Sequence, residues 1–237
     1  MLLQATKITK RFGHRTILDE VEIKVQPGEV VSILGPNGAG KTTLIKILST
    51  LIKPGSGDLC IAGTNALENA LHVRPSLGVV VHEPLAYLEF TPYENLAFFG
   101  KMYAIDSLER RINTLLGEVG LAQFAHDQMR VFSRGMIQRF MIAKSLIHNP
   151  TLLLLDEPFS GLDVAAKQFV LDRIHHERSQ GKGIVLTTHD TELAYIAGSR
   201  FLFLLNADLK AVAQKDEIAV DELAHRYEQD LKQHQMK

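Results

Sequence analysis

The chain has 237 residues, and its net charge of -1 and isoelectric point of about 6.8 provide no basic field for nucleic acids. Its length suffices for one domain that buries roughly 70–75% of the surface of the unfolded chain. The single cysteine, Cys60, excludes an internal disulfide and fits a reducing compartment. No apolar run approaches the roughly 18 residues of a membrane span, and the first residues lack a signal-peptide layout. We therefore expect no nucleic-acid partner and no direct membrane insertion.

Strands alternate with helices along most of the chain, which predicts an α/β fold with a mostly parallel sheet and helices on its faces. Partial period-two alternation favours antiparallel strands at 2–8 and 21–25. Further strands are predicted at 30–34, 59–63, 77–81, 151–155 and 183–187, and helices at 41–51, 165–180 and 216–233. Residues 84–149 show only helical patterns, with helix starts at Thr91-Pro92-Tyr93-Glu94 and Asp106-Ser107-Leu108-Glu109, so we expect an inserted helical subdomain.

A glycine-rich loop joins the predicted strand at 30–34 to the helix that follows it. The loop reads Gly35-Pro36-Asn37-Gly38-Ala39-Gly40-Lys41-Thr42-Thr43. Glycines allow its N–H groups to approach an anion, and the positive end of the helix dipole adds to the attraction. Lys41 can then reach the β- and γ-phosphates, and the Thr42 hydroxyl can ligate Mg²⁺. A glycine turn with an ordinary lysine is the alternative, but the strand–loop–helix context favours a nucleoside triphosphate site.

Two later strands end in polar side chains that suit the same chemistry. Asp156 and Glu157 follow an apolar strand, and ligands bind at the carboxyl ends of parallel strands. Asp156 is a candidate to hold Mg²⁺ through its water shell, and Glu157 to orient or deprotonate the attacking water. His189 follows the strand at 183–187 and is a candidate partner of the γ-phosphate. The alternatives are solvated acids at a strand end and a structural histidine.

Two further features indicate which nucleotide base is bound and whether a second protomer takes part in the site. Phe12, in a predicted turn, can stack on a base or fill the core, and the chain has no Asn-Lys-x-Asp motif to read guanine, which favours ATP. Ser133 and Gly135 precede a helical run and form a second anion site of the helix N-terminus type. Two such sites in one chain make sense if the second faces the nucleotide of another protomer.

With these motifs in their order from Phe12 to His189, the chain resembles the nucleotide-binding subunit of ABC (ATP-binding cassette) transporters. Residues 35–43 resemble the Walker A loop, 152–157 the Walker B strand with its catalytic glutamate, and 132–139 the signature. Residues 160–163, ending in Asp163, resemble the D-loop, and His189 resembles the switch histidine. The resemblance implies a P-loop NTPase cassette: a catalytic core with an antiparallel β part at 1–83 and 150–210, a helical subdomain at 84–149 and a C-terminal helical tail at 211–237.

The chain departs from the family pattern in the signature, in the Q-loop and at the aromatic residue that stacks on the base. Arg134 gives the signature the sequence Ser-Arg-Gly-Met, where Ser-Gly-Gly-Gln is usual, and adds a cation near the γ-phosphate of the opposite subunit. His82 stands where the Q-loop glutamine is expected, and Phe12 stands where tyrosine is common. Within the family, Ser-Arg-Gly-Met, the Q-loop histidine and the sequence Asp-Glu-Pro-Phe-Ser-Gly-Leu-Asp at 156–163 resemble the ATPases of haem exporters in cytochrome c maturation, and also subunits for multidrug or polysaccharide export.

The resemblance also implies the mechanism and the partners. Two ATPase subunits, identical or different, close head-to-tail over two ATP molecules with Mg²⁺ and drive a separate multi-span membrane permease. Lys41, Mg²⁺ and Ser133–Gly135 of the opposite subunit stabilise γ-phosphoryl charge, while Glu157 positions water. His189 holds the γ-phosphate, and Asp163 links the two sites. Such a protein is cytoplasmic and peripheral on the inner face of the cell membrane.

The region between His82 and Phe90 is expected to pass the closure on to the permease. Its apolar residues Tyr87, Leu88 and Phe90 suit that contact, and a local hydrophobic plug is the alternative. Two other functional classes remain open. A soluble ABC ATPase acting on ribosomes or DNA usually carries two cassettes or a long coiled-coil insertion, and the chain shows neither. A non-hydrolysing regulatory cassette is the other class, and Glu157 and His189 argue against it.

Overall fold

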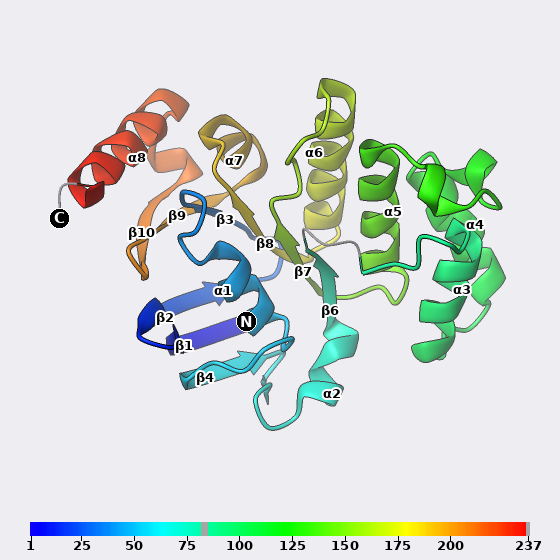
Figure 1. Ribbon diagram of the computed structural model, residues 1–237, viewed down its shortest axis with the longest axis horizontal. Helices are drawn as coiled ribbons and strands as arrows, with labels where there is room; N and C mark the ends of the chain where they lie inside the picture. The colour runs from blue at the N-terminus through cyan, green and yellow to red at the C-terminus, as the bar shows by residue number, and fades with distance from the viewer. Residues whose placement is uncertain (82–84, 236–237) are drawn as a thin grey trace.

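The computed structural model describes residues 1–81 and 85–235, which form two β-sheets with helices packed around them (Figure 1). The larger sheet contains β3 (Val30–Leu34), β6 (Leu77–Val80), β7 (Leu152–Asp156), β8 (Gly183–Thr188), β9 (Arg200–Leu205) and β10 (Asp208–Gln214). The smaller sheet contains β1 (Leu3–Phe12), β2 (Arg15–Val25), β4 (Ser56–Ile61) and β5 (Thr64–Asn65). Among the described residues, the strand orders are β10-β9-β3-β8-β7-β6 and β2-β1-β4-β5.

The larger sheet is parallel from β6 to β9, and β10 pairs antiparallel with β9. Every residue of β3, β7 and β8 is buried, because both faces of a parallel sheet are covered. The register pairs Leu34 with Thr188 and Asp156 with Thr187, so these three strands end at one edge of the sheet. The smaller sheet is antiparallel, as the alternation of polar and apolar residues predicts.

Eight α-helices surround the sheets in the described part of the chain. They are α1 (Lys41–Leu48), α2 (Ala70–Val73), α3 (Pro92–Met102), α4 (Leu108–Glu118), α5 (Arg134–Leu146), α6 (Val164–Ser179), α7 (Thr191–Ala197) and α8 (Val220–Gln235). Short 3₁₀ helices cover Arg74–Ser76, Ala122–Phe124, Met129–Val131 and Lys215–Glu217. None of the helices in this part of the chain combines the length and the hydropathy that a membrane crossing requires.

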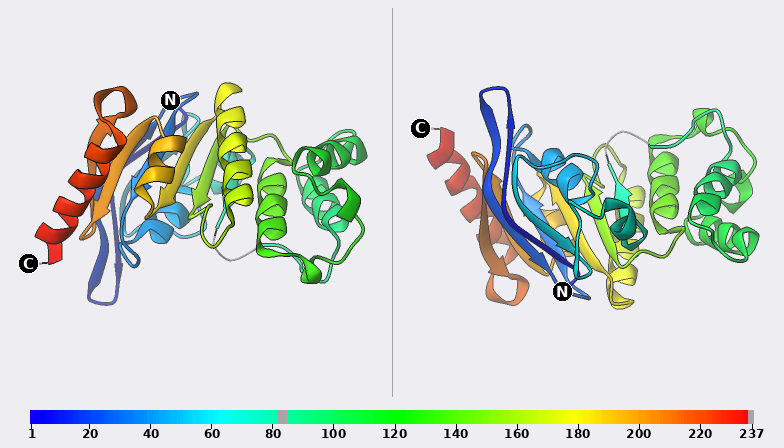
Figure 2. Two further views of the ribbon diagram at one scale, coloured as in Figure 1. Left: turned by 90° about the horizontal axis from the view of Figure 1, so that it is seen from above. Right: turned by 90° about the horizontal axis from the view of Figure 1, so that it is seen from below.

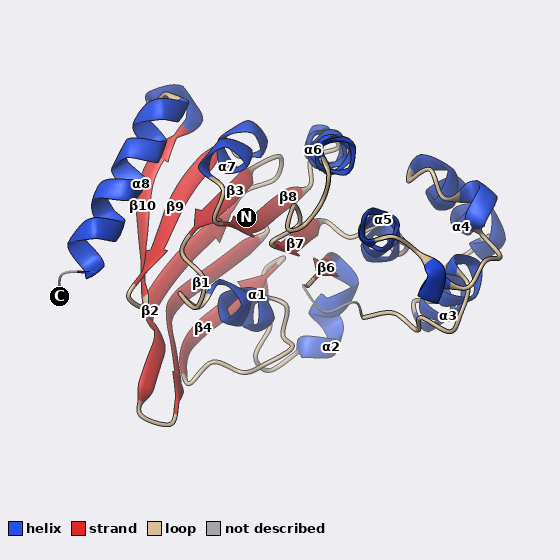
Figure 3. Cartoon of the chain, turned by 45° about the horizontal axis from the view of Figure 1, so that its top comes forward, coloured by secondary structure: helices blue, strands red, loops and turns tan. Residues whose placement is uncertain are grey.

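Alternating side chains of the larger sheet build two separate layers of core. Leu152 and Leu154 of β7 pack in one cluster with α1 and the smaller sheet, while Leu153 and Leu155 pack in another with α5 and α6. Accordingly α1 lies on one side of the larger sheet, and α6, α7 and α8 lie on the other (Figure 3). Helices α3, α4 and α5 gather at the β6 end of the molecule, and α8 lies at the opposite end (Figures 1 and 2).

The helix start at Thr91 is confirmed, because Thr91 and Glu94 exchange the two hydrogen bonds of a capping box. The helix start predicted at Asp106-Ser107-Leu108-Glu109 is also confirmed, because α4 begins at Leu108, but Ser107 has a left-handed φ of 51° and its side chain makes no capping hydrogen bond. The predicted hairpin strands are too short, because β1 continues to Phe12 and leaves only Gly13 and His14 in the turn. The strands β9 and β10 were not predicted.

The C-terminal segment begins differently from the prediction. Residues 211–214 belong to β10 instead of a helical tail, and α8 begins at Val220 instead of 216. The apolar side chains expected on this helix, Ile218, Leu223, Tyr227 and Leu231, do pack together against β9. The subdomain boundaries inferred from the sequence remain predictions.

Candidate active site

The glycine-rich loop connects β3 to α1 at the edge where the central parallel strands end. Gly38 and Gly40 have positive φ angles of 81° and 107°, which favour glycine. A Cβ on Gly40 would lie 2.9 Å from the carbonyl oxygen of Ile17, so the loop also packs against β2. The first N–H groups of α1 have no partners within the helix, and its first turn contains no acidic side chain. The loop therefore presents N–H groups and the positive end of the helix dipole to an anion.

Lys41 is held inside this loop and is only 6% exposed. Its ammonium group donates hydrogen bonds to the carbonyl oxygens of Gly35 at 2.6 Å and Pro36 at 3.1 Å. It also forms an ion pair with Glu157, with 3.0 Å between Nζ and Oε1. The structure thus brings together the lysine and the glutamate that the sequence separates by more than 100 positions.

Asp156 ends β7 and is 2% exposed. Its Oδ2 accepts a 2.7 Å hydrogen bond from the Thr42 hydroxyl, and its Oδ1 accepts a 2.7 Å hydrogen bond from the Thr187 hydroxyl. Thr187 was not predicted as a site residue, because its role depends on the register that pairs it with Asp156 across β7 and β8. Both carboxylate oxygens of this buried acid therefore have hydroxyl donors.

Glu157 adopts a left-handed backbone conformation with φ of 48°, an uncommon state for a residue other than glycine that often marks functional sites. Its N–H group donates to both the carbonyl oxygen and the hydroxyl of Thr187, each at 3.1 Å. Its carboxylate lies 3.1 Å from Nδ1 of His189, which is 55% exposed. Thr187 therefore holds the backbone of Glu157, and Lys41 and His189 hold its carboxylate.

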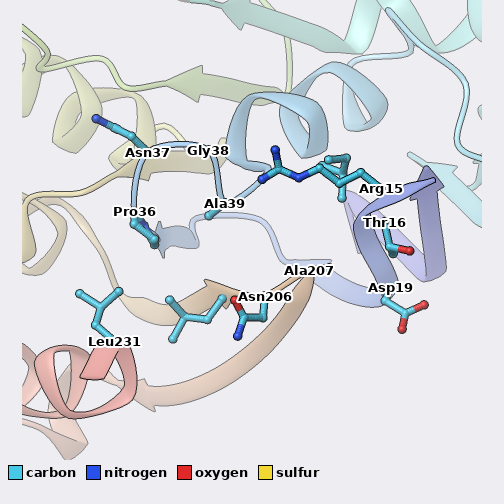
Figure 4. Close-up of a pocket in the computed structure, with 12 residues that line it drawn as sticks. Arg15, Thr16, Asp19, Pro36, Asn37, Gly38, Ala39, Asn206, Ala207 and Leu231 are labelled. Atoms are coloured by element: carbon cyan, nitrogen blue, oxygen red, sulfur yellow. The ribbon is translucent and has the colours of Figure 1, made fainter. Parts of the chain in front are cut away.

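Two adjacent cavities border the loop and share Arg15, Ile17 and residues 36–38. The smaller cavity has a volume of about 230 Å³. Besides the shared residues, it is lined by Phe12, Gly40, Lys41, Thr42, Thr43 and Glu157. A larger cavity of about 490 Å³ lies between the loop, β2, the β9–β10 turn and α8, and includes Ala39, Asn206 and Leu231 (Figure 4). The Phe12 ring at the rim is 55% exposed, with Nζ of Lys10 5.3 Å from its centroid, so it is available for stacking and is not a core residue.

The signature residues lie apart from these two cavities. Ser133 caps α5 by accepting a 3.3 Å hydrogen bond from the N–H group of Met136, and Asp163 caps α6 by accepting one at 2.8 Å from Ala166. Ser133, Gly135 and Asp163 do not line the cavity that contains Lys41. Within this chain the structure therefore does not join them to the phosphate loop. His82, the remaining predicted contact, lies outside the described residues.

Arg134 occupies an unexpected place. Its guanidinium group covers Gly161, since a Cβ on that glycine would lie 2.2 Å from Nη1. Arg134 also lines a cavity of about 270 Å³ together with Asp156, Glu157 and Ser160. The substituted signature residue therefore contacts the D-loop of its own chain.

The oxygen donors at the site suit a magnesium ion. Thr42 and Asp156 come from adjacent elements and offer a hydroxyl and a carboxylate, the hard ligands that Mg²⁺ prefers. No group of three or more potential side-chain ligands among His, Cys, Asp and Glu occurs in the described residues. Mg²⁺ usually binds through one or two carboxylates, waters and substrate phosphates, so these two residues fit it as part of a nucleotide complex.

Comparison with known proteins identifies the family. The sequence model of ABC transporters matches residues 18–160, which include the loop lysine and both acids at the end of β7. The chain belongs to the ABC transporter family. Related ATP-binding proteins of this family include "Nod factor export ATP-binding protein I" of Cupriavidus metallidurans, 37% identical over 81% of this chain and 64% of the relative. The "Linearmycin resistance ATP-binding protein LnrL" of Bacillus subtilis is 32% identical over 92% of this chain and 70% of the relative.

The chain spans about three fifths of the length of the Nod factor export proteins that it matches, with 60% for that of Cupriavidus pinatubonensis. Among solved structures, an ATP-binding subunit of an ABC transporter superposes with a TM-score of 0.87 at 30% identity, covering 96% of this chain and 99% of that one. A dimeric ATP-binding cassette in a post-hydrolysis state with ADP and Pi gives 0.82 at 25% identity, covering 90% and 99%. The predicted cassette fold and family are confirmed. The names of these relatives give no support to the haem-exporter subtype.

Proposed function

We propose that this chain binds and hydrolyses ATP as the nucleotide-binding subunit of an ABC exporter. The observation that carries the proposal is the convergence of Lys41, Thr42, Asp156, Glu157 and His189 at the edge where β3, β7 and β8 end. One of the superposed cassettes was solved with ADP and Pi, the products of the proposed reaction. Phosphoryl transfer requires positioning and charge stabilisation above all, and both are provided by side chains fixed by hydrogen bonds.

In this mechanism each residue has a separate task. Phe12 stacks on the base, the loop N–H groups bind the phosphates, and Lys41 contacts the β- and γ-phosphates. Thr42 and Asp156 would hold Mg²⁺, which when bound neutralises phosphate charge. Glu157 orients the attacking water and accepts its proton, while His189 contacts the γ-phosphate.

A second ATPase subunit completes the proposed site. Ser133 and Asp163 are exposed at the starts of α5 and α6, outside the cavity of their own chain, where they can meet the nucleotide of a facing subunit. The dimeric state of the superposed ADP-bound cassette supports this arrangement. The expected helical subdomain, residues 84–149, which includes α5, would move during closure.

The proposed contact with a multi-span permease uses an apolar patch on that part of the chain. Leu85, Tyr87, Leu88, Phe90 and Phe98 are each more than 40% exposed. The Tyr87 ring lies 5.2 Å from that of Phe90 and 5.5 Å from that of Phe98, so the patch is partly packed on itself yet open to a partner. A patch of this kind commonly marks an interaction site. Through it the chain would be peripheral on the cytoplasmic face of the membrane.

The names of the relatives bear on the class of cargo. The relatives are named for Nod factor export and for linearmycin resistance, which favours the drug or polysaccharide classes over haem. Haem remains the alternative cargo suggested by the signature sequence. A test is a pull-down of tagged protein from detergent-solubilised native membranes with ATP, with mass spectrometry and haem absorbance. A co-purified multi-span protein supports the transporter role, whereas only ribosomal or nucleic-acid-bound partners would overturn it.

The catalytic assignment is tested by Glu157→Gln, which keeps the shape of the side chain and removes its basicity. We expect turnover to fall by more than about 100-fold, as for the loss of a general base, while ATP still binds. Glu192→Gln is the matched control, because Glu192 is exposed in the first turn of α7 and lines none of the cavities described above. Wild-type turnover in Glu157→Gln would refute the assignment of the base. Absence of ATP binding by the wild type would refute the proposed function itself.

A further inference from the structure

Arg15 is the neighbour of Phe12, the proposed platform for the nucleotide base, across the β1–β2 hairpin. It is the first residue of β2. It lines both cavities that border the loop. In Figure 4 its side chain extends from β2 toward the loop segment that carries Gly38 and Ala39. Within the described ranges, no other charged side chain lines both cavities.

The guanidinium group of Arg15 is available for a ligand. The side chain is exposed, and among the described residues it forms no ion pair and donates no side-chain hydrogen bond. Asp19 lines the larger cavity, but its carboxylate forms no ion pair with the guanidinium group of Arg15. A guanidinium group carries five N–H donors in a plane and binds phosphate well. An unpaired arginine is common on protein surfaces; this one stands beside a loop built to receive phosphates.

The neighbours of Arg15 indicate which part of a nucleotide it meets. In the proposed function Phe12 stacks on the base while Lys41 and Thr42 serve the phosphates, and all three residues line the smaller cavity. Arg15 lines the same cavity and also contributes to the wall shared with the larger one. The ribose and the α-phosphate lie between the base and the outer phosphates of any nucleoside triphosphate.

We propose that Arg15 is a nucleotide-binding residue that contacts the α-phosphate and the ribose edge of bound ATP. The proposal rests on the proposed function, because it requires ATP in this cavity. It adds a contact outside the motifs that resemble the family pattern. Since ATP and ADP share the α-phosphate, Arg15 contributes equally to the binding of both. It differs in this from Lys41 and His189, whose proposed contacts reach toward the γ-phosphate.

The test is the dissociation constant of ATP and of ADP for the wild type, Arg15→Ala, Arg15→Lys and Arg11→Ala. Arg11→Ala removes the same charge from the same exposed hairpin, and Arg11 lines neither cavity. We expect Arg15→Ala to weaken both nucleotides by the same factor, about three- to tenfold for one charge-assisted contact in a partly exposed site. Arg15→Lys should lie between, Arg11→Ala should match the wild type, and the melting temperature without nucleotide should not change.

Three outcomes would overturn the inference. Wild-type affinity of Arg15→Ala for ATP would exclude the contact. Weakening of ATP without weakening of ADP would place Arg15 at the γ-phosphate, and an equal effect of Arg11→Ala would reduce the effect to net charge. If the wild type binds neither nucleotide, the proposed function fails first, so the two failures are distinguishable.

Discussion

Thr187→Val removes one hydroxyl that supports both acids of the site. Thr187 is fully buried, and its hydroxyl donates to Oδ1 of Asp156 at 2.7 Å while it accepts from the N–H group of Glu157 at 3.1 Å. Valine has nearly the same shape and an equally good preference for a strand, so the backbone of β8 should be kept. The substitution therefore isolates the hydrogen bonds from the packing.

The expected loss of stability follows from these two bonds. A hydrogen bond to a charged group contributes about 1.5–3 kcal/mol, and here the carboxylate of Asp156 is only 2% exposed. The Glu157 N–H group retains the Thr187 carbonyl oxygen, so its loss is small. The new methyl group returns about 0.8 kcal/mol of apolar burial. We therefore expect the free energy of unfolding to fall by about 1–2 kcal/mol.

The assay is urea denaturation followed by far-UV circular dichroism, because the chain contains no tryptophan. Thr187→Ser keeps the hydroxyl and should retain most of the stability. Thr188→Val is the matched control, since its hydroxyl accepts from the N–H group of Asp190 and contacts neither acid. Equal stability of Thr187→Val and the wild type, or an equal loss in Thr188→Val, would refute the reasoning. In the ATPase assay Thr187→Val should lower kcat more than it raises KM, because the hydroxyl contacts both the Asp156 carboxylate and the Glu157 N–H group.

Three further predictions concern the loop and the surrounding packing. Gly40→Ala should abolish ATP binding and lower the melting temperature, because the new Cβ would meet the carbonyl oxygen of Ile17. Gly38→Ala has open space around its Cβ, so it should cost only about 1 kcal/mol of backbone strain. Glu177→Gln should lower the free energy of unfolding, measured by urea denaturation, by about 3 kcal/mol. The substitution removes the buried carboxylate that the partly buried cations of Arg173 and Lys182 share. Burial lowers the pKa of Lys144 from 10.5 to about 8. Between pH 8 and 10.5 the unfolded chain therefore binds more protons than the folded chain, and the free energy of unfolding should rise with pH. Urea denaturation at the two ends of this pH range should show a smaller rise for Lys144→Met than for the wild type.

The sequence was sufficient for features that depend on local pattern. The loop at 35–43 and the acids after the apolar strand are recognisable because each is a short run next to one strand, and the structure brings them together. Residues 200–205 also form an almost unbroken apolar run, a pattern that is sufficient to predict β9 as a buried strand. The weaker pattern of β10 is half exposed and is explained only by its pairing with β9.

The remaining site features depend on contacts between distant segments. Thr187 meets Asp156 through strand register, and Arg134 meets Gly161 through the approach of α5 to the D-loop. Neither contact is encoded by the spacing of residues along the chain. The failed cap at Ser107 shows the same limit, because a favourable residue type does not fix the backbone angle that a cap requires.

The partners of Lys41 connect nucleotide binding to the proposed catalytic base. An ammonium group has three donors, and within this structure they face the carbonyl oxygens of Gly35 and Pro36 and the carboxylate of Glu157. A phosphate that bonds to Lys41 must replace at least one of them. The two carbonyl groups belong to the loop backbone, whereas the Glu157 carboxylate is a side chain that also has His189 as a partner, so Glu157 is the partner most readily exchanged. Phosphate binding to Lys41 would therefore release the base in the same step, and this exchange explains why Glu157→Gln, which gives up the ion pair in advance, should bind ATP at least as tightly as the wild type.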